Sequence, residues 1–150
     1  MPNPNNEKVE LIQLINGVKE LFADIDGSKI SIETEFDELY INGDKDQFVR
    51  VFNNLIKNAL QAIPADRNGK VEISILKQKE MAQISIRDNG VGIDESKRFK
   101  IFVPYFTTKS NGTGLGLAMV KQIIENHNGT IDFESLEGSG TVFRIEIPYL

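Results

Sequence analysis

Hydrophobic positions along the chain follow two periods, one near 3.6 residues and one of two residues. The longer period predicts helices over residues 9–22, 45–63 and 115–126, and a further short helix is expected over residues 95–102. The two-residue period predicts strands over residues 30–36, 71–77, 82–87, 130–135 and 141–147, with another short strand beginning at Tyr40 and Ile41. Pro64 and the Asn128-Gly129 pair end two of the helices, and residues 137–140 form a turn between the closing strands.

Helices that alternate with strands of a mixed sheet predict a single α/β unit with the two layers of a sandwich. A length of 150 residues suits one domain with a substantial core. Residues 1–6 contain two prolines and three asparagines and are expected to form a disordered head. The folded domain is therefore expected over residues 7–150.

Composition and charge exclude several classes of function. The chain has no cysteine, which excludes disulfides, thiolate zinc sites and cysteine nucleophiles. No apolar run reaches the roughly 20 residues that a membrane span needs. A net charge of −5 argues against a nucleic-acid surface. Locally, Lys97, Arg98, Lys100 and Lys109 form a basic cluster, which suits a polyanion such as a triphosphate, although a solvated polar face is the simpler explanation for Lys97 and Arg98.

Neutral amides form a stripe along one edge of the helix predicted over residues 45–63. Gln47, Asn54, Asn58 and Gln61 lie nearly one above another, although asparagine is a poor helix former. Amide carbonyl oxygens are suitable ligands for a magnesium ion that keeps water and phosphate oxygens. The alternative is a helix edge that merely caps a loop.

Asp88 ends a strand whose apolar side chains all lie on one face. The two-residue alternation places Asp88 on the same face as Ile84 and Ile86, where a carboxylate needs a partner. Gly90 and Gly92 follow and permit a close approach of the backbone. A planar base with an amino donor fits such a pocket, although a strand-end aspartate before an Asn-Gly turn is also common in other β proteins.

The glycine-rich residues 112–117 open the helix predicted over residues 115–126. Backbone N–H groups at a helix start bind phosphate, and glycines let phosphates come close. A Walker loop is excluded because no Gly-Lys-Ser or Gly-Lys-Thr follows the glycines. A dinucleotide-binding fold would place Asp132 at a suitable spacing, but polar, turn-like residues 107–111 stand where that fold needs a strand.

Four segments in this order resemble the N, G1, F and G2 boxes of the ATP-binding domain of sensor histidine kinases, especially of the nitrogen-regulation class. They are Asn54-Leu55-Ile56-Lys57-Asn58-Ala59, Asp88-Asn89-Gly90-Val91-Gly92-Ile93, Phe106-Thr107-Thr108-Lys109 and Gly112-Thr113-Gly114-Leu115-Gly116-Leu117. The resemblance covers residues 6–148 and extends to the wider ATPase superfamily of gyrase, Hsp90 and MutL. It implies a mixed, mostly antiparallel sheet of about five strands packed on three helices.

The resemblance also implies a role for each matching residue. Asp88 would bind the adenine amino group, Thr141 would contact the base through water, and Ala62 and Ile93 would form apolar walls. Asn58 would be the Mg²⁺ ligand beside Asn54, and Lys109 would reach the γ-phosphate. The remaining nucleotide contacts would come from Gln61, Gly90, Gly92, Gly112, Thr113, Gly114, Leu115, Gly116 and Leu117.

The function implied by the resemblance is transfer of the γ-phosphoryl group of Mg–ATP to a histidine on a separate dimerisation domain. A cognate response regulator would act downstream, in the cytoplasm, without contact with nucleic acid or membrane by this domain. Asn54 stands where hydrolysing relatives have glutamate, and asparagine cannot act as a general base. A serine kinase of the anti-sigma-factor type and a nucleotide-sensing module that transfers nothing are the alternatives.

Two further expectations concern His127 and the segment of residues 104–113. His127 lies at a helix C-terminus on its inner face, so a structural role is expected rather than that of a phosphoryl acceptor. Residues 104–113 have few large apolar side chains and are expected to form a mobile lid that nucleotide phosphates order.

Overall fold

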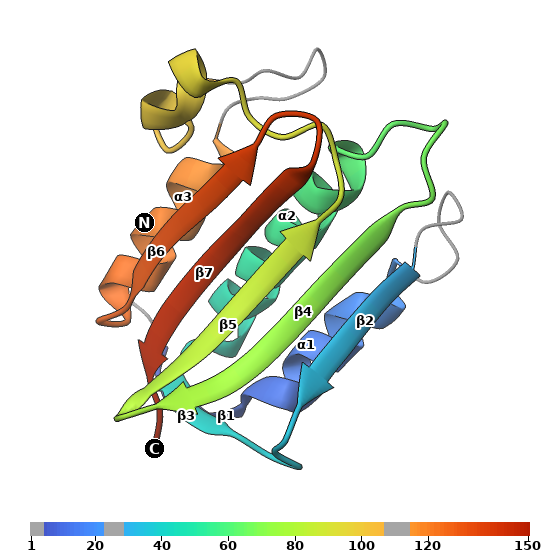
Figure 1. The fold of residues 1–150 in the computed structure, drawn as a ribbon. Coiled ribbons are helices and arrows are strands. Elements are labelled where there is room, and N and C mark those ends of the chain that lie inside the picture. Colours follow the sequence, from blue (N-terminus) through green and yellow to red (C-terminus); the bar gives the residue numbers. More distant parts are fainter. Residues whose placement is uncertain (1–4, 23–28, 107–114) are drawn as a thin grey trace.

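A computed structural model describes residues 5–22, 29–106 and 115–150 (Figure 1). A five-stranded sheet forms one layer, and helices α1, α2 and α3 cover one of its faces. The strand order is β2-β4-β5-β7-β6; β2 and β4 are parallel, and the other neighbouring pairs are antiparallel. The predicted two-layer sandwich with a mixed, mostly antiparallel sheet is confirmed.

The elements agree closely with the predicted ones. The strands of the sheet are β2 (Lys29–Thr34), β4 (Lys70–Gln78), β5 (Met81–Asp88), β6 (Thr130–Leu136) and β7 (Gly140–Pro148). The helices are α1 (Leu11–Glu20), α2 (Lys45–Gln61), α3 (Gly116–Asn126) and the 3₁₀ helix η1 (Glu95–Lys100). A separate two-stranded sheet pairs β1 (Glu7–Glu10) with β3 (Tyr40–Gly43).

The prediction of one helix over residues 9–22 was wrong at its start. Residues 7–10 form β1, in which Val9 pairs with Ile41 of β3. The side chain of Glu10 then caps α1, because it accepts hydrogen bonds from the backbone N–H groups of Ile12 at 2.6 Å and Gln13 at 3.2 Å. A cap of this kind fixes the first helical residue, and the helical spacing of Val9 is a coincidence.

Several other predicted ends shift by one or two residues. β2 stops at Thr34, whose hydroxyl accepts a hydrogen bond from the N–H of Phe36 at 3.2 Å. The segment predicted as a helix over residues 95–102 is the 3₁₀ helix η1, and it ends at Lys100. α2 ends at Gln61 rather than at residue 63, because Pro64 restricts the residue before it to extended conformations.

Asp44 caps the start of α2. Its Oδ1 accepts hydrogen bonds from the N–H groups of Asp46 at 3.1 Å and Gln47 at 3.3 Å, and its Oδ2 accepts one from Asn5 at 2.9 Å. The bond from Asn5, with those from Gln47 and Asp46, holds the pKa of the Asp44 carboxyl below its usual range. The stabilisation by this cap is therefore present at neutral pH and is lost as the pH falls through the lowered pKa.

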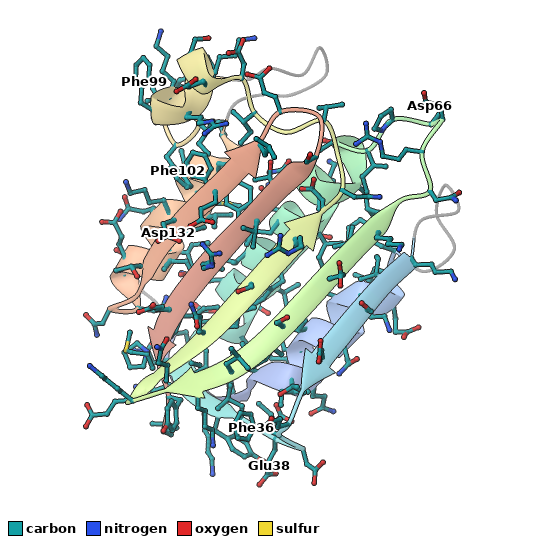
Figure 2. The ribbon with its side chains drawn as sticks, viewed as in Figure 1. Phe36, Glu38, Asp66, Phe99, Phe102 and Asp132 are labelled. Atoms are coloured by element: carbon teal, nitrogen blue, oxygen red, sulfur yellow. The ribbon has the colours of Figure 1, made fainter. Side chains whose placement is uncertain are left out.

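The core lies between the sheet and the helices. α2 is the central helix, since it contacts α1 on one side, α3 on the other, and β4 and β5 beneath. Alternate side chains of β4, β5 and β7 point into this layer, including the fully buried Val71, Ile75, Ala82, Ile84 and Ile145. The other face of the sheet is polar, as Asp132 on β6 illustrates (Figure 2). Within the described ranges, no helix is long and apolar enough to cross a membrane.

Candidate functional site

Those predicted site residues that the structure describes lie at one end of the sheet, where the loop after β5, the β6–β7 turn, the end of α2 and the start of α3 come together (top of Figure 1). α2 and α3 run antiparallel. The ring of His127, which caps the end of α3, lies 4.5 Å from that of Phe48 near the start of α2. At the opposite end, a Cβ atom on Gly116 would meet the side chain of Asn54. The sheet and the two helices thus bring four distant segments into one site.

Asp88 is buried at the end of β5, with 6% of its surface exposed. It continues the buried row of Ile84 and Ile86, as the two-residue alternation predicts. Its Oδ1 accepts a hydrogen bond from the N–H of Gly90 at 2.8 Å and one from Thr141 at 3.3 Å. Two backbone amides therefore fix one oxygen of the carboxylate, and this sets the direction of the other.

The glycines after Asp88 are required by close approaches of the backbone. A Cβ atom on Gly90 would lie 2.8 Å from the Cβ of Ala62, and the neighbouring N–H of Val91 donates to the carbonyl of Ala62 at 2.9 Å. Gly92 has a φ of +77° and packs against the backbone of Leu136. The structure thus brings the predicted residues Ala62, Gly90 and Gly92 together around the loop that follows Asp88.

Ser135 connects three residues of the site and was missed by the sequence analysis. Its hydroxyl accepts a hydrogen bond from the N–H of Ile93 at 2.7 Å, donates to the carbonyl of Gly140 at 3.2 Å, and lies 2.9 Å from the hydroxyl of Thr141. Ser135 follows Ile131 and Phe133 on the inner face of β6, and this alternation is the signal that could have identified it. Ser135 thus connects Ile93 to Thr141.

Asn54 and Asn58 form a hydrogen-bonded pair on the face of α2 that lies toward α3. The amide nitrogen of Asn58 donates to Oδ1 of Asn54 at 3.1 Å. Because the nitrogen of Asn58 is directed toward Asn54, its carbonyl oxygen points the other way. This orientation suits an oxygen that coordinates a cation.

The outer members of the amide stripe have different surroundings. Gln61 is exposed at the end of α2 next to Ala62, where a ligand can reach it. Gln47 is buried near the start of α2, and its Oε1 has no hydrogen-bond partner in the described part of the chain. The stripe therefore reaches the site through Asn54, Asn58 and Gln61 only.

The start of α3 lies beside Asn54. Leu115 precedes the helix and is 42% exposed, and no side chain among the described residues caps the first turn. Gly116 and Leu117 are half-buried. Lys109, Gly112, Thr113 and Gly114 lie outside the described residues, as do all residues after 106 of the segment expected to form a lid.

The described part of the chain offers a metal ion amide oxygens rather than a cluster of acidic or histidine side chains. No group of three or more His, Cys, Asp or Glu side chains gathers anywhere in residues 5–22, 29–106 and 115–150. Mg²⁺ prefers oxygen ligands and commonly takes only one or two from the protein, the rest being water and phosphate. The oriented carbonyl of Asn58 fits that type of coordination.

His127 is structural in its contacts, as predicted. It is 6% exposed; its Nε2 accepts a hydrogen bond from the N–H of Asp44 at 3.1 Å, and its Nδ1 lies 2.8 Å from the carbonyl of Ile123. The carbonyl can only accept, so Nδ1 is the protonated nitrogen. The imidazole thus connects the start of α2 to the end of α3, far from the segments that form the site.

Gly116→Ala is expected to weaken the ATP binding that the sequence resemblance implies, by about 2- to 12-fold and without unfolding the protein. The new methyl group would displace the flexible side chain of Asn54 and break its hydrogen bond to Asn58, which is worth about 0.5–1.5 kcal/mol. Titration calorimetry measures the affinity. Gly17→Ala is the matched control, because a Cβ atom there meets nothing within 4 Å. Unchanged affinity in Gly116→Ala would show that the Asn54–Asn58 pair is not part of the binding site.

The chain belongs to the family of histidine kinase-, DNA gyrase B- and HSP90-like ATPases, which residues 43–150 match. It is 40% identical over 139 residues to sporulation kinase A of Bacillus subtilis, covering 93% of this chain and 23% of that kinase. It is 47% identical over 109 residues to the signal transduction histidine-protein kinase AtoS of Escherichia coli, covering 72% of this chain and 18% of AtoS. The chain thus spans about a fifth of the length of these relatives.

Solved structures agree with this assignment. The catalytic domain of the histidine kinase ThkA, in a nucleotide-free form, is 34% identical with a TM-score of 0.86, and the match covers 96% of this chain and 95% of that domain. A structure of ThkA in complex with the response regulator protein TrrA matches with 30% identity and a TM-score of 0.81, over 98% of this chain and 42% of that ThkA chain. The predicted resemblance to histidine kinase catalytic domains is confirmed.

Proposed function

We propose that this domain binds Mg–ATP and donates the γ-phosphoryl group to a histidine on a separate dimerisation domain in two-component signalling. It would act as the catalytic domain of a sensor histidine kinase. The buried carboxylate of Asp88 is the main support for this proposal. Its direction is fixed by a hydrogen bond, and it lies at the end of the row of buried apolar side chains on β5. Its second oxygen can accept a hydrogen bond from the amino group of adenine.

The base would lie between Asp88 and the loop that Gly90 and Gly92 form. Ala62 and Ile93 would supply apolar contacts, and the hydroxyl of Thr141 would reach the base directly or through water. The phosphates would extend from there toward the start of α3, where backbone N–H groups of residues 112–117 would bind them. Lys109 would neutralise charge on the γ-phosphate.

Transfer in such a site depends on positioning and on neutralisation of charge. Asn58 would bind the Mg²⁺ ion beside the phosphates, with Asn54 next to it. The ion would neutralise phosphate charge when bound. A nitrogen of the acceptor imidazole would attack the γ-phosphorus in line with the bond to ADP, which leaves. Neither Asn54 nor Asn58 has a carboxylate to deprotonate water, so ATP is preserved for the histidine acceptor.

The partners follow from the same proposal. The acceptor would be the dimerisation domain of the same kinase, and a cognate response regulator would then receive the phosphoryl group. The complex of the similar kinase ThkA with the response regulator TrrA supports this second partner. Since ATP and response regulators are found in the cytoplasm, we place the domain there.

A phosphotransfer assay with γ-labelled ATP tests the proposal. The domain alone is expected to bind ATP but to remain unlabelled, and a histidine kinase dimerisation domain added to it is expected to become labelled. Separation of the two proteins on a gel measures the label on each. His127→Gln is the control and should retain transfer once folded, because both ring nitrogens of His127 contact backbone groups.

Three outcomes would contradict the proposal. Label on the domain alone that is acid-labile and lost in His127→Gln would make His127 the acceptor. Rapid hydrolysis of ATP with no label on any partner would assign the domain to the hydrolysing members of the family. Label on serine of an added partner would favour the serine-kinase alternative.

A further inference from the structure

Arg67, in the loop between α2 and β4, contacts the loop after Asp88 from outside the site. Its neighbour Asp66 marks the tip of this loop in Figure 2. Nη1 of Arg67 donates hydrogen bonds to the carbonyl oxygens of Asn89 at 2.7 Å and Gly90 at 2.9 Å, and it lies 3.3 Å from that of Gly138. One guanidinium group therefore joins the loop after β5 to the β6–β7 turn.

The first of these bonds acts on Asp88 through a single peptide group. The carbonyl of Asn89 and the N–H of Gly90 belong to the same planar peptide and point in opposite directions. Arg67 holds the carbonyl end of this peptide at 2.7 Å, while Oδ1 of Asp88 accepts from its N–H end at 2.8 Å. Rotation of the peptide would break both bonds together, so Arg67 and the carboxylate of Asp88 fix each other's position.

The next peptide is held in the same way. Arg67 binds the carbonyl of Gly90, and the N–H of Val91 on the same peptide donates to the carbonyl of Ala62 at 2.9 Å. The N–H of Gly138 in turn donates to the carbonyl of Val91 at 2.7 Å. The loop after Asp88 is thus held by Arg67 on one side and by α2 and the β6–β7 turn on the other.

The charge of Arg67 is directed to these carbonyls. Among the described residues, no carboxylate lies within ion-pair distance of its guanidinium. Hydrogen bonds from a charged donor are stronger than neutral ones, and they polarise the peptide that accepts them. A polarised peptide makes the N–H of Gly90 a better donor to the carboxylate of Asp88.

The side chain of Asn89 adds a second connection between the two loops. Its Oδ1 accepts a hydrogen bond from the N–H of Lys70 at 2.8 Å, and its Nδ2 donates to the carbonyl of Asn68 at 2.8 Å. Arg67 and Asn89 thus both connect the loop before β4 to the loop after β5. This double connection holds the loop with Arg67 against the residue that follows Asp88.

We propose that Arg67 is a positioning residue for base recognition, which orients the carboxylate of Asp88 through the Asn89–Gly90 peptide and so sets the preference for a purine with a 6-amino group. This inference rests on the proposed contact between Asp88 and adenine. Arg67 itself touches no part of the base. Its effect on binding is confined to recognition of the amino group, because in the proposed binding mode the phosphates extend toward the start of α3.

The test compares ATP with purine ribonucleoside triphosphate, which lacks the 6-amino group, by titration calorimetry. Arg67→Ala is expected to weaken ATP binding about tenfold and to leave the analogue nearly unchanged, so that the preference for ATP falls about tenfold. In an Asp88→Asn background, Arg67→Ala should change ATP affinity less than about twofold, because the residue it positions is already altered. Arg67→Lys keeps the charge but lacks the planar donor fork, so the preference for ATP should fall by about threefold.

Arg144→Ala is the matched control. Arg144 forms a 3.2 Å ion pair with Glu134 on the open face of the sheet, and its loss should leave both affinities unchanged. Thermal unfolding with each variant identifies loss of the fold; if Arg67→Ala does not fold, Arg67→Lys decides the question.

The outcomes separate the two proposals. Equal weakening of both triphosphates by Arg67→Ala, or full additivity with Asp88→Asn, would reduce Arg67 to a structural residue and overturn the inference alone. A parent domain that binds both triphosphates equally would contradict the contact between Asp88 and adenine, and the inference with it.

Discussion

Asp88→Asn is expected to lower the affinity for ATP by about 1.5–3 kcal/mol, or about 10- to 160-fold. The two backbone amides at Oδ1 determine how asparagine would sit, because the oxygen of the new side chain would take the place of Oδ1. Its NH₂ group would then face the adenine amino group, and two donors would oppose each other. Calorimetric titration of ATP into the parent and variant domains measures the loss.

GTP and a surface substitution provide the comparisons for this experiment. GTP has a carbonyl at position six of the base, so the parent domain should bind it poorly, since two acceptors would face each other. Asp132→Asn changes a carboxylate on the exposed face of β6 and should leave the affinity for ATP unchanged. Similar affinities for ATP and GTP in the parent domain would rule out Asp88 as the residue that recognises the base.

Phe48→Ala is expected to lower the free energy of unfolding by about 3–5 kcal/mol. Phe48 is fully buried on α2, packs against the ring of His127 and lies close to Gly43. Removal of the ring would leave a cavity between the start of α2 and the end of α3. The stability of most single domains is only about 5–15 kcal/mol, so this loss would be severe. Urea unfolding followed by circular dichroism gives the value.

Phe99→Ala is the control for the effect of losing an aromatic ring. Phe99 on η1 is 77% exposed, so its replacement should change the stability by less than about 0.5 kcal/mol. Comparable losses for Phe48→Ala and Phe99→Ala would mean that Phe48 is not in a packed core.

Periodicity predicted most of the fold and the burial of two residues of the candidate site. The alternation of apolar residues along β5 placed Asp88 on the buried face, and the alternation along β7 placed Thr141 on the inward face. Both residues are buried, and the register pairs them directly. A pattern of period two has this power because it fixes the face on which every side chain of a strand lies.

Contacts between loops could not be predicted in this way. Arg67 lies in a polar loop with no period, and its partners are backbone carbonyls, which every residue type has. The strand β1 escaped prediction because the spacing of Val9 also fits the helix that follows. The position of Ser135 on the inner face was available from β6, but its three hydrogen bonds depend on how the β6–β7 turn meets the loop after β5.

The antiparallel arrangement of α2 and α3 gives the two ends of the site opposite electrostatic character. The partial positive charge of a helix N-terminus lies at the start of α3, and the partial negative charge of a C-terminus lies at the end of α2, beside Ala62. The first would stabilise a triphosphate, and the second would stabilise a base that carries an amino group. Under the proposed function, a nucleotide entering in the reverse direction would meet repulsion at both ends, so the backbone dipoles would favour one direction of ATP binding before any side chain makes contact.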